Sequence, residues 1–172
     1  MQPYCFQNIM LKGKRGIIFG IANDHSIAWG ISKKLSEHGA ELALTYQNDT
    51  FLKRIKPLSE EINSKLLIEC DFSQSNSIKK CFDIINQKWD SIDFVVHAAA
   101  FSDKNELNGR YIDTSLSNFI NTLNISCYSF TEISRFASSM MNNGGSLLTL
   151  SFYGANKVMP NYNVMGVAKA AL

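Results

Sequence analysis

Apolar residues along this chain alternate between short continuous runs and longer stretches with helical spacing. Five runs of six to eight residues are rich in apolar side chains, and each is predicted to be a strand: 15–20, 41–46, 65–70, 93–100 and 146–151. Between the runs, apolar residues recur at every third or fourth position, as Ile27, Ile31 and Leu35 do. This spacing is typical of helices that bury one side.

Glycine and spacing set the expected helix limits. The helix after the first strand ends at Gly39, and the longest helix is predicted from about residue 115 to 141, ahead of Gly144 and Gly145. A last helix is expected to start near Asn161 and to run to the end of the sequence. The order of elements is therefore strand, helix, strand, repeated along the chain.

Strands that are apolar on both faces, alternating with amphipathic helices, indicate a parallel sheet covered on both sides. We predict an α/β fold of the doubly wound, Rossmann-like kind. Its dinucleotide-binding version has strand order 3-2-1-4-5-6 and binds its ligand at the carboxyl ends of the strands. Because 172 residues suit one hydrophobic core and no linker interrupts them, one domain is expected over 11–172, after an N-terminal extension of 1–10.

Composition excludes several classes of function. The 17 basic and 15 acidic residues are scattered, which argues against a nucleic-acid-binding surface. Cys5, Cys70, Cys81 and Cys127 lack metal-binding spacing, so reduced thiols, no metal and a cytoplasmic location are predicted. The sequence has no apolar run of about 18 residues and no secretory signal at its start, so no membrane association is expected.

The turn after the first strand, "GIANDHSIAWG", is a candidate phosphate-binding turn although it is not GxGxxG. Gly20 permits a tight turn, and Ser26 and Ile27 stand at a helix N-terminus, where free N–H groups favour an anion such as pyrophosphate. An ordinary turn capped by Ser26 explains the same residues, so both interpretations stay open.

Polar residues follow the second and third strands. Gln47 stands where an NAD-binding domain commonly contacts the adenosine ribose; it can bond a hydroxyl but offers no charge to a 2′-phosphate, which favours NADH over NADPH. A solvent-facing Gln47 is the alternative. Asp71 is expected to accept a hydrogen bond from an adenine amino group, to cap a helix beginning near Ser73, or both.

The fourth strand ends in small residues, "HAAAF". Small side chains there let a nicotinamide ribose approach the backbone closely, although core packing alone also explains them. His97 lies inside the strand pattern and is predicted to be a structural histidine with a local hydrogen bond. His25 and His38 are expected in a loop and on a helix surface.

Tyr162 and Lys169 stand seven positions apart near the end of the chain. On a helix they share one face and lie roughly 10 Å apart along the axis. A phenol stays protonated at neutral pH and can donate to a developing oxyanion, and an ammonium can hold ribose hydroxyls. Such pairs also occur by chance, so the pair alone does not decide its function.

Several longer segments resemble the bacterial NADH-dependent enoyl-acyl-carrier-protein reductases, a divergent branch of the short-chain dehydrogenase/reductase superfamily. The likeness runs from about Leu11 to Leu172 and is carried by "GIANDHSIAWGI", "GAELALTYQND", "KNELNGRYIDTSLSNF", "ISCYSF", "GGSLLTLS" and "GANKVMPNYNVMGVAKAAL". The Tyr-x6-Lys spacing is typical of this branch. Ordinary superfamily members, such as 3-ketoacyl reductases, use Tyr-x3-Lys.

The resemblance implies a role for each matching position. In the family, NADH delivers hydride to the β-carbon of a trans-2-enoyl thioester carried by acyl carrier protein, and the tyrosine stabilises the enolate. Gly20, Ser26 and Ile27 are implied to hold the pyrophosphate of NAD, Gln47 to lie near the adenosine ribose, and Asp71 and Phe72 to lie near the adenine. Ala99 and Lys169 are implied to contact the nicotinamide ribose and Ser102 the acyl substrate. Tyr162 is implied to donate to the oxyanion. The family also forms tetramers, which implies a homo-oligomer.

The chain departs from the family at two places. Phe152 replaces the tyrosine that usually follows the serine ending strand five, and Tyr153 stands one position later. Family members also continue beyond the position of Leu172 into further strands and a mobile helical segment, so we expect C-terminal strands to be missing, strand five to be an edge and turnover to be poor. The first hypothesis is the N-terminal part of a fatty-acid-synthesis reductase. The alternative is a non-catalytic remnant that binds nucleotide or pairs with intact subunits.

Overall fold

Five parallel strands form the sheet at the centre of the fold. The computed structural model describes residues 10–172, and its strands are β1 (Arg15–Phe19), β2 (Glu41–Tyr46), β3 (Leu66–Glu69), β4 (Phe94–His97) and β5 (Ser146–Thr149). They are ordered β3-β2-β1-β4-β5, and each pairs in parallel with its neighbours. This is the strand order of a doubly wound dinucleotide-binding sheet, so the predicted α/β Rossmann-like fold is confirmed.

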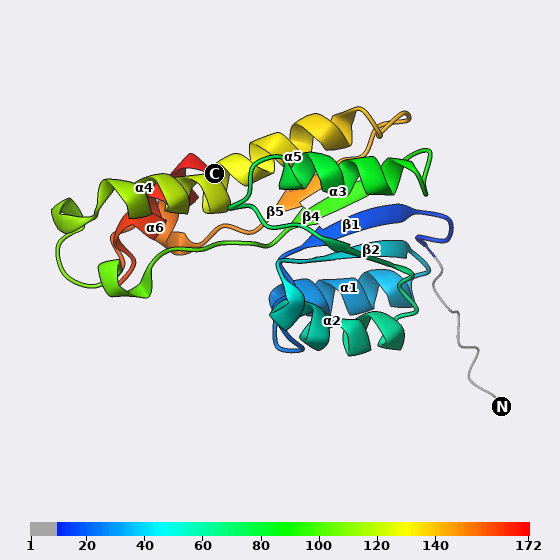
Figure 1. Ribbon diagram of the computed structural model, residues 1–172, viewed down its shortest axis with the longest axis horizontal. Coiled ribbons are helices and arrows are strands. Elements are labelled where there is room, and N and C mark those ends of the chain that lie inside the picture. The colour runs from blue at the N-terminus through cyan, green and yellow to red at the C-terminus, as the bar shows by residue number, and fades with distance from the viewer. Residues whose placement is uncertain (1–9) are drawn as a thin grey trace.

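Helices cover both faces of the sheet (Figure 1). The α-helices of the described residues are α1 (Ile27–Glu37), α2 (Asp49–Glu61), α3 (Ser77–Asn86), α4 (Leu116–Leu123), α5 (Ser129–Ser138) and α6 (Asn163–Ala171). The short 3₁₀ turns are η1 (Lys104–Glu106), η2 (Tyr111–Asp113) and η4 (Tyr153–Ala155). Helices α1 and α2 lie on one face and α3 and α5 on the other, whereas α4 and α6 lie side by side beyond the sheet, at the left of Figure 1.

Alternate residues of β1, β2, β3 and β4 supply the two cores. Ile17 and Phe19 of β1 point toward α3 and α5, while Ile18 between them points toward α1 and α2. All three side chains are fully buried. Because successive strand residues face opposite sides, a strand buried on both faces has to be apolar at most positions, which is the pattern seen in the sequence.

The long helix expected from about 115 to 141 is interrupted. Helix α4 leads into a π-helical turn, η3 (Asn124–Tyr128), which leads into α5. Ser126 lies buried in this turn, where its hydroxyl accepts from the Phe101 amide at 2.9 Å and donates to the Phe101 carbonyl at 3.0 Å. This tie to the segment after β4 lies between residues 25 positions apart, so the apolar spacing along the helix does not predict it.

Strand β5 is the edge of the sheet, and its outer residues are exposed. Leu147 and Leu148 are 39% and 45% exposed, although both belong to the apolar run that predicted the strand. The free thiols of Cys70 and Cys81 are buried and that of Cys127 is half-buried, while Cys5 lies outside the described residues. Within residues 10–172, none of the helices has the length and apolar character needed to cross a membrane.

Candidate functional site

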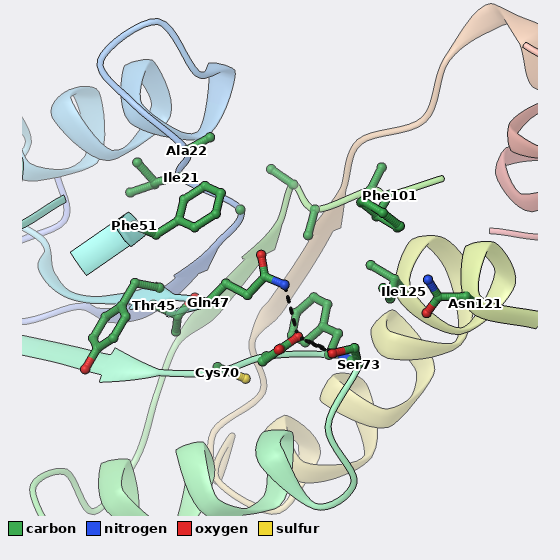
Figure 2. A pocket seen from close by; sticks show the side chains of 17 residues that line it. Ile21, Ala22, Thr45, Gln47, Phe51, Cys70, Ser73, Phe101, Asn121 and Ile125 are labelled. Carbon is green, nitrogen blue, oxygen red and sulfur yellow. Dashed lines mark hydrogen bonds between the residues drawn. The ribbon is translucent and has the colours of Figure 1, made fainter. Parts of the chain in front are cut away.

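A cleft of about 600 Å³ opens at the carboxyl ends of β1, β2, β3 and β4 (Figure 2). Parallel strands deliver the residues that follow them to the same edge of the sheet, and the crevice there is the usual ligand site of this fold. Residues predicted to bind a dinucleotide line the cleft at five positions: Gly20, Gln47, Asp71, Phe72 and Ala99. The sequence thus identified the cleft from residues up to 79 positions apart.

Gly20 brings two walls of the cleft together. Its φ of 98° lies in the left-handed region, and an added Cβ would stand 2.4 Å from the Ala98 carbonyl. Only glycine therefore allows the end of β1 to approach the segment after β4 this closely. The tight turn predicted at Gly20 is confirmed.

Ser26 shapes the turn before α1 but does not cap the helix with its side chain. Its hydroxyl accepts from the amides of Ala22 and Asn23, both at 3.0 Å, and donates to the Asn23 carbonyl. Ser26 is the N-cap residue of α1, as the ordinary-turn interpretation expected, but its side-chain oxygen bonds to the loop and makes no capping hydrogen bond to the helix. Within the described chain, the first amides of α1 stay free of a side-chain partner, and Ile27 itself is exposed. Ala22, not Ser26 or Ile27, lines the cleft.

Gln47 and Asp71 meet across the cleft floor, where Gln47 Nε2 donates to Asp71 Oδ1 at 3.3 Å (Figure 2). The same carboxylate oxygen accepts from the Ser73 amide at 2.9 Å and from the Ser73 hydroxyl at 2.8 Å. Helix α3 begins only at Ser77, with Asn76 at its N-cap, so the expectation that Asp71 caps a helix near Ser73 is wrong. Asp71 instead closes a local turn through this one carboxylate oxygen, and the residue lines the cleft.

Several residues of the cleft region were missed by the sequence analysis. Phe51 and Ile125 line the cleft, but an apolar side chain on a predicted helix gives no local signal of a ligand site. Asn124, in the π turn, donates from its side chain to the Phe72 carbonyl at 3.0 Å and so fixes the floor. No local spacing reveals that contact, which joins positions 52 apart.

His97 at the end of β4 is fully buried, as the prediction of a structural histidine requires. Its Nδ1 lies 2.9 Å from the Thr149 hydroxyl and its Nε2 lies 2.8 Å from the Ser129 hydroxyl. Burial and, to a smaller extent, the nearby Lys169 ammonium together lower the pKa of His97 to about 4. The ring is therefore neutral at physiological pH.

Tyr162 is the residue just before α6, whose start was predicted near Asn161 but lies at Asn163. Asn161 and Asn163 have φ of 57° and 25°, so the backbone on both sides of Tyr162 is not helical. The phenol ring meets the Phe152 ring edge-on, with centroids 4.9 Å apart. Burial raises the pKa of Tyr162, so its hydroxyl is protonated at neutral pH.

Lys169 lies within α6 and is only 8% exposed. Its Nζ donates to the Leu150 carbonyl at 2.8 Å, and its own carbonyl accepts from the Ser151 hydroxyl at 3.2 Å. Burial lowers the pKa of Lys169, and Cys127 acts in the opposite direction. Tyr162 and Lys169 both contact the segment that follows β5, although neither lines the cleft.

Ser102 is buried rather than presented to the cleft. Thr122 donates to its hydroxyl at 2.9 Å, and Asn118 Nδ2 does so at 3.3 Å. Its neighbour Phe101 lines the cleft instead. Near the end of β5, Phe152 packs on Tyr162, and Tyr153 is 59% exposed.

Comparison with known proteins decides the family. Residues 20–172 match the family described as Enoyl-(Acyl carrier protein) reductase. The chain belongs to this family. The NADH-dependent enoyl-acyl-carrier-protein reductase of Rickettsia conorii is 57% identical over 163 residues, which cover 95% of this chain and 63% of that protein.

Solved structures of family members have the same fold as this reductase-family chain. The enoyl-acyl-carrier-protein reductase of Anaplasma phagocytophilum, crystallised with NAD, is 58% identical with a TM-score of 0.91, over 95% of this chain and 62% of that one. The enzyme of Bacillus cereus, crystallised with NADP+ and an indole naphthyridinone, is 38% identical with a TM-score of 0.91, over 94% and 64%. The chain thus spans less than two thirds of the length of these relatives.

Proposed function

We propose that this chain carries the cofactor-binding and catalytic residues of an NADH-dependent enoyl-acyl-carrier-protein reductase of fatty acid biosynthesis. The observation that carries the proposal is the cleft at the carboxyl ends of the strands, lined together by Gly20, Gln47, Asp71, Phe72 and Ala99. Membership of the reductase family supports the same function. The relatives named NADH-dependent, and the NAD complex of one, favour NADH as the cofactor.

The cleft fits a dinucleotide in size and chemistry. Its volume of about 600 Å³ is in the range typical of small-molecule sites, and its walls are mostly apolar with a few polar groups. Asp71 offers a carboxylate oxygen to an adenine amino group, and Gly20 and Ala99 let a ligand approach the backbone. The amides of Ile27 and Ala28 at the start of α1 suit a pyrophosphate. Gln47 offers no positive charge to a 2′-phosphate, so NADPH is expected to bind more weakly.

Tyr162 is proposed to stabilise the enolate oxygen of the substrate. When bound, NADH supplies the hydride that reaches the β-carbon of a trans-2-enoyl thioester. The negative charge then develops on the thioester oxygen, and a hydrogen bond from the Tyr162 hydroxyl to that oxygen strengthens as the charge grows. Because burial raises the pKa of Tyr162, the phenol keeps its proton at neutral pH and can donate this hydrogen bond.

Lys169 is proposed to hold ribose hydroxyls and keep the local potential positive. Its ammonium has three protons, and one is used by the Leu150 carbonyl at 2.8 Å. Two protons therefore remain for a ligand. The neutral ring of His97 beside it adds no competing charge.

The proposed substrate is an enoyl chain carried by acyl carrier protein, and the proposed assembly is a homo-oligomer. The exposed apolar side chains of Leu116 and Ile120 on α4 and of Tyr128 in η3 support an assembly surface. Ser102 as an acyl contact requires its buried hydroxyl network to open, so Phe101 is the residue better placed for that role. A cytoplasmic location remains a prediction.

NADH binding by the 172-residue chain tests the proposal. The variant Asp71→Asn keeps the oxygen that bonds Ser73 but places an amide N–H where the adenine amino group has to donate. A hydrogen bond to a charged group contributes about 1.5–3 kcal/mol, so the variant is expected to bind NADH about 10- to 100-fold more weakly, measured by isothermal titration calorimetry. Asp83→Asn, which alters an exposed carboxylate on α3, is the matched control and should bind as the original chain does.

A second variant separates binding from chemistry. Tyr162→Phe removes only the hydroxyl, so it is expected to bind NADH within about twofold of the original chain and to lose crotonyl-thioester-dependent NADH oxidation. Folded chain that binds no NADH, or equal losses in Asp71→Asn and Asp83→Asn, would contradict the proposal.

A further inference from the structure

The backbone around Tyr162 is held in a conformation that non-glycine residues seldom adopt. Asn161 and Asn163, its two neighbours, have φ of 57° and 25°. Tyr162 itself, at φ −126° and ψ −21°, is not yet helical. Asparagine tolerates the left-handed region, but the φ of 25° at Asn163 lies outside the usual range of that region, so contacts around Asn163 have to hold this backbone.

The side chain of Asn163 makes that contact. Its Nδ2 lies 3.1 Å from the Glu106 carbonyl, 3.2 Å from the Asn108 carbonyl and 3.4 Å from the Gly109 carbonyl. These three carbonyls belong to one loop, more than 50 positions earlier in the sequence. A single amide group thus ties the first residue of α6 to residues 106–109.

The loop is itself fixed at the other end. The Glu106 carboxylate accepts from the Ser115 amide at 2.9 Å, the Ser115 hydroxyl at 2.8 Å and Asn118 Nδ2 at 3.1 Å. These hydrogen bonds, from Ser115 above all, lower the pKa of Glu106. Residues 106–109 are therefore held against the N-terminus of α4. Through the hydrogen bonds of Asn163, the same loop also holds the first residue of α6.

The phenol ring of Tyr162 lies in a slot between Gly154, Gly166 and Phe152. A Cβ on Gly154 would lie 2.5 Å from the ring, and a Cβ on Gly166 would lie 3.6 Å from it. Phe152 closes the slot with an edge-on contact. Tyr162 directly precedes Asn163 in the chain, so a backbone shift at Asn163 moves the Tyr162 ring relative to this slot.

We propose that Asn163 is a positioning residue for Tyr162: its side-chain amide, bonded to the carbonyls of 106–109, holds the phenol in the slot formed by Gly154, Gly166 and Phe152. The inference rests on the proposed function, since it assigns Asn163 to the orientation of the hydroxyl that meets the enolate. Asn163 touches neither substrate nor cofactor in this role. The tether itself exists whether or not the chain reduces a thioester.

The variant Asn163→Gly isolates the amide, because glycine accepts the left-handed backbone at this position and removes only the side chain. Protein labelled at tyrosine is studied by NMR, with Tyr162 assigned by comparison with Tyr162→Phe. In the original chain, nuclear Overhauser contacts are expected between the Tyr162 ring and the α-protons of Gly154 and Gly166. In Asn163→Gly these contacts should be lost, and the phenol pKa should fall toward that of an exposed tyrosine.

Asn161→Gly is the matched control. It changes a left-handed asparagine on the other side of Tyr162, in the same turn, whose side chain is exposed. The ring contacts and phenol pKa should be retained in this variant. If Asn163→Gly does not fold, Glu106→Ala replaces it: the carbonyl of residue 106 remains while the loop loses its anchor to α4, so the ring contacts should again be lost.

The outcomes separate the inference from the proposed function. Unchanged ring contacts and phenol pKa in the folded Asn163 or Glu106 variant overturn the tether, as do equal losses in Asn161→Gly. NADH binding is measured on the same samples and should be unaffected by Asn163→Gly. An original chain that shows the tether but binds no NADH defeats the proposed function and leaves the tether standing.

Discussion

The neutral, buried ring of His97 predicts a specific loss of stability in mild acid. Ser129 donates its hydroxyl proton to the Ile125 carbonyl at 2.7 Å, so toward His97 Nε2 its oxygen is the acceptor. Nε2 therefore carries the proton, and the Thr149 hydroxyl donates to Nδ1. A second proton on the ring would have to break the hydrogen bond from Thr149 to Nδ1. The resulting positive charge would be buried and close to the Lys169 ammonium, and both effects oppose protonation.

The magnitude follows from proton linkage. The folded pKa of about 4 lies below the ordinary value of 6.5, so the unfolded chain takes up a proton at a pH where the folded chain does not. Stability from this group is complete above pH 6.5 and is lost as pH falls toward 4. At 1.36 kcal/mol per pH unit the full loss is about 3 kcal/mol, of which about 2 kcal/mol is lost by pH 5.

Urea unfolding followed by circular dichroism, at pH 7.5 and at pH 5, measures this difference. The variant His97→Gln cannot take up the proton, so its free energy of unfolding should change about 2 kcal/mol less between the two pH values than that of the original chain. His25→Gln, at an exposed histidine outside the core, is the matched control. Staying at or above pH 5 keeps most carboxylates ionised in both states.

Equal pH dependence in the original chain and His97→Gln would refute the reasoning. So would a direct NMR titration in which the His97 ring takes up its proton near pH 6.5. In either case the buried ring would not be the source of acid sensitivity, and its contacts with Ser129 and Thr149 would have to adapt to the charged form.

Two further predictions concern the cleft and the helix beside it. Gly20→Ala places a Cβ 2.4 Å from the Ala98 carbonyl in a left-handed backbone, so it should weaken NADH binding and lower the free energy of unfolding. Gly144 is also left-handed but has open space around it, so Gly144→Ala should lower the free energy of unfolding less. Chemical denaturation compares the two variants. Asn48→Ala removes the oxygen that accepts from the Thr50 and Phe51 amides at the start of α2, and should lower the unfolding free energy by about 1 kcal/mol, whereas a change within about 0.3 kcal/mol would contradict the capping role.

The sequence by itself determined the order of the elements. A strand buried on both faces has to be apolar at most positions, and a helix on a sheet has to repeat its apolar residues every third or fourth position, so these local patterns carry the α/β fold. Gly20 could be placed in a tight turn for a similar local reason. The general rule that ligands bind where parallel strands end pointed to Gly20, Gln47 and Asp71, and the family resemblance added Phe72 and Ala99.

Only the tertiary structure decided which side chains meet across long stretches of chain. The neutral tautomer of His97 depends on Ser129 and Thr149, which are 32 and 52 positions away. The π turn that divides the long helix lies within an unbroken apolar spacing.

The start of α6 shows the same division between local and distant causes. The sequence predicted a helix near this place, and the spacing of Tyr162 and Lys169 suggested a shared face. The first residue of that helix, Asn163, bonds to the loop at 106–109, more than 50 positions away, which no local pattern predicts. Periodicity reports which side of a helix is buried, whereas the contact that sets a terminus depends on what the rest of the fold brings beside it.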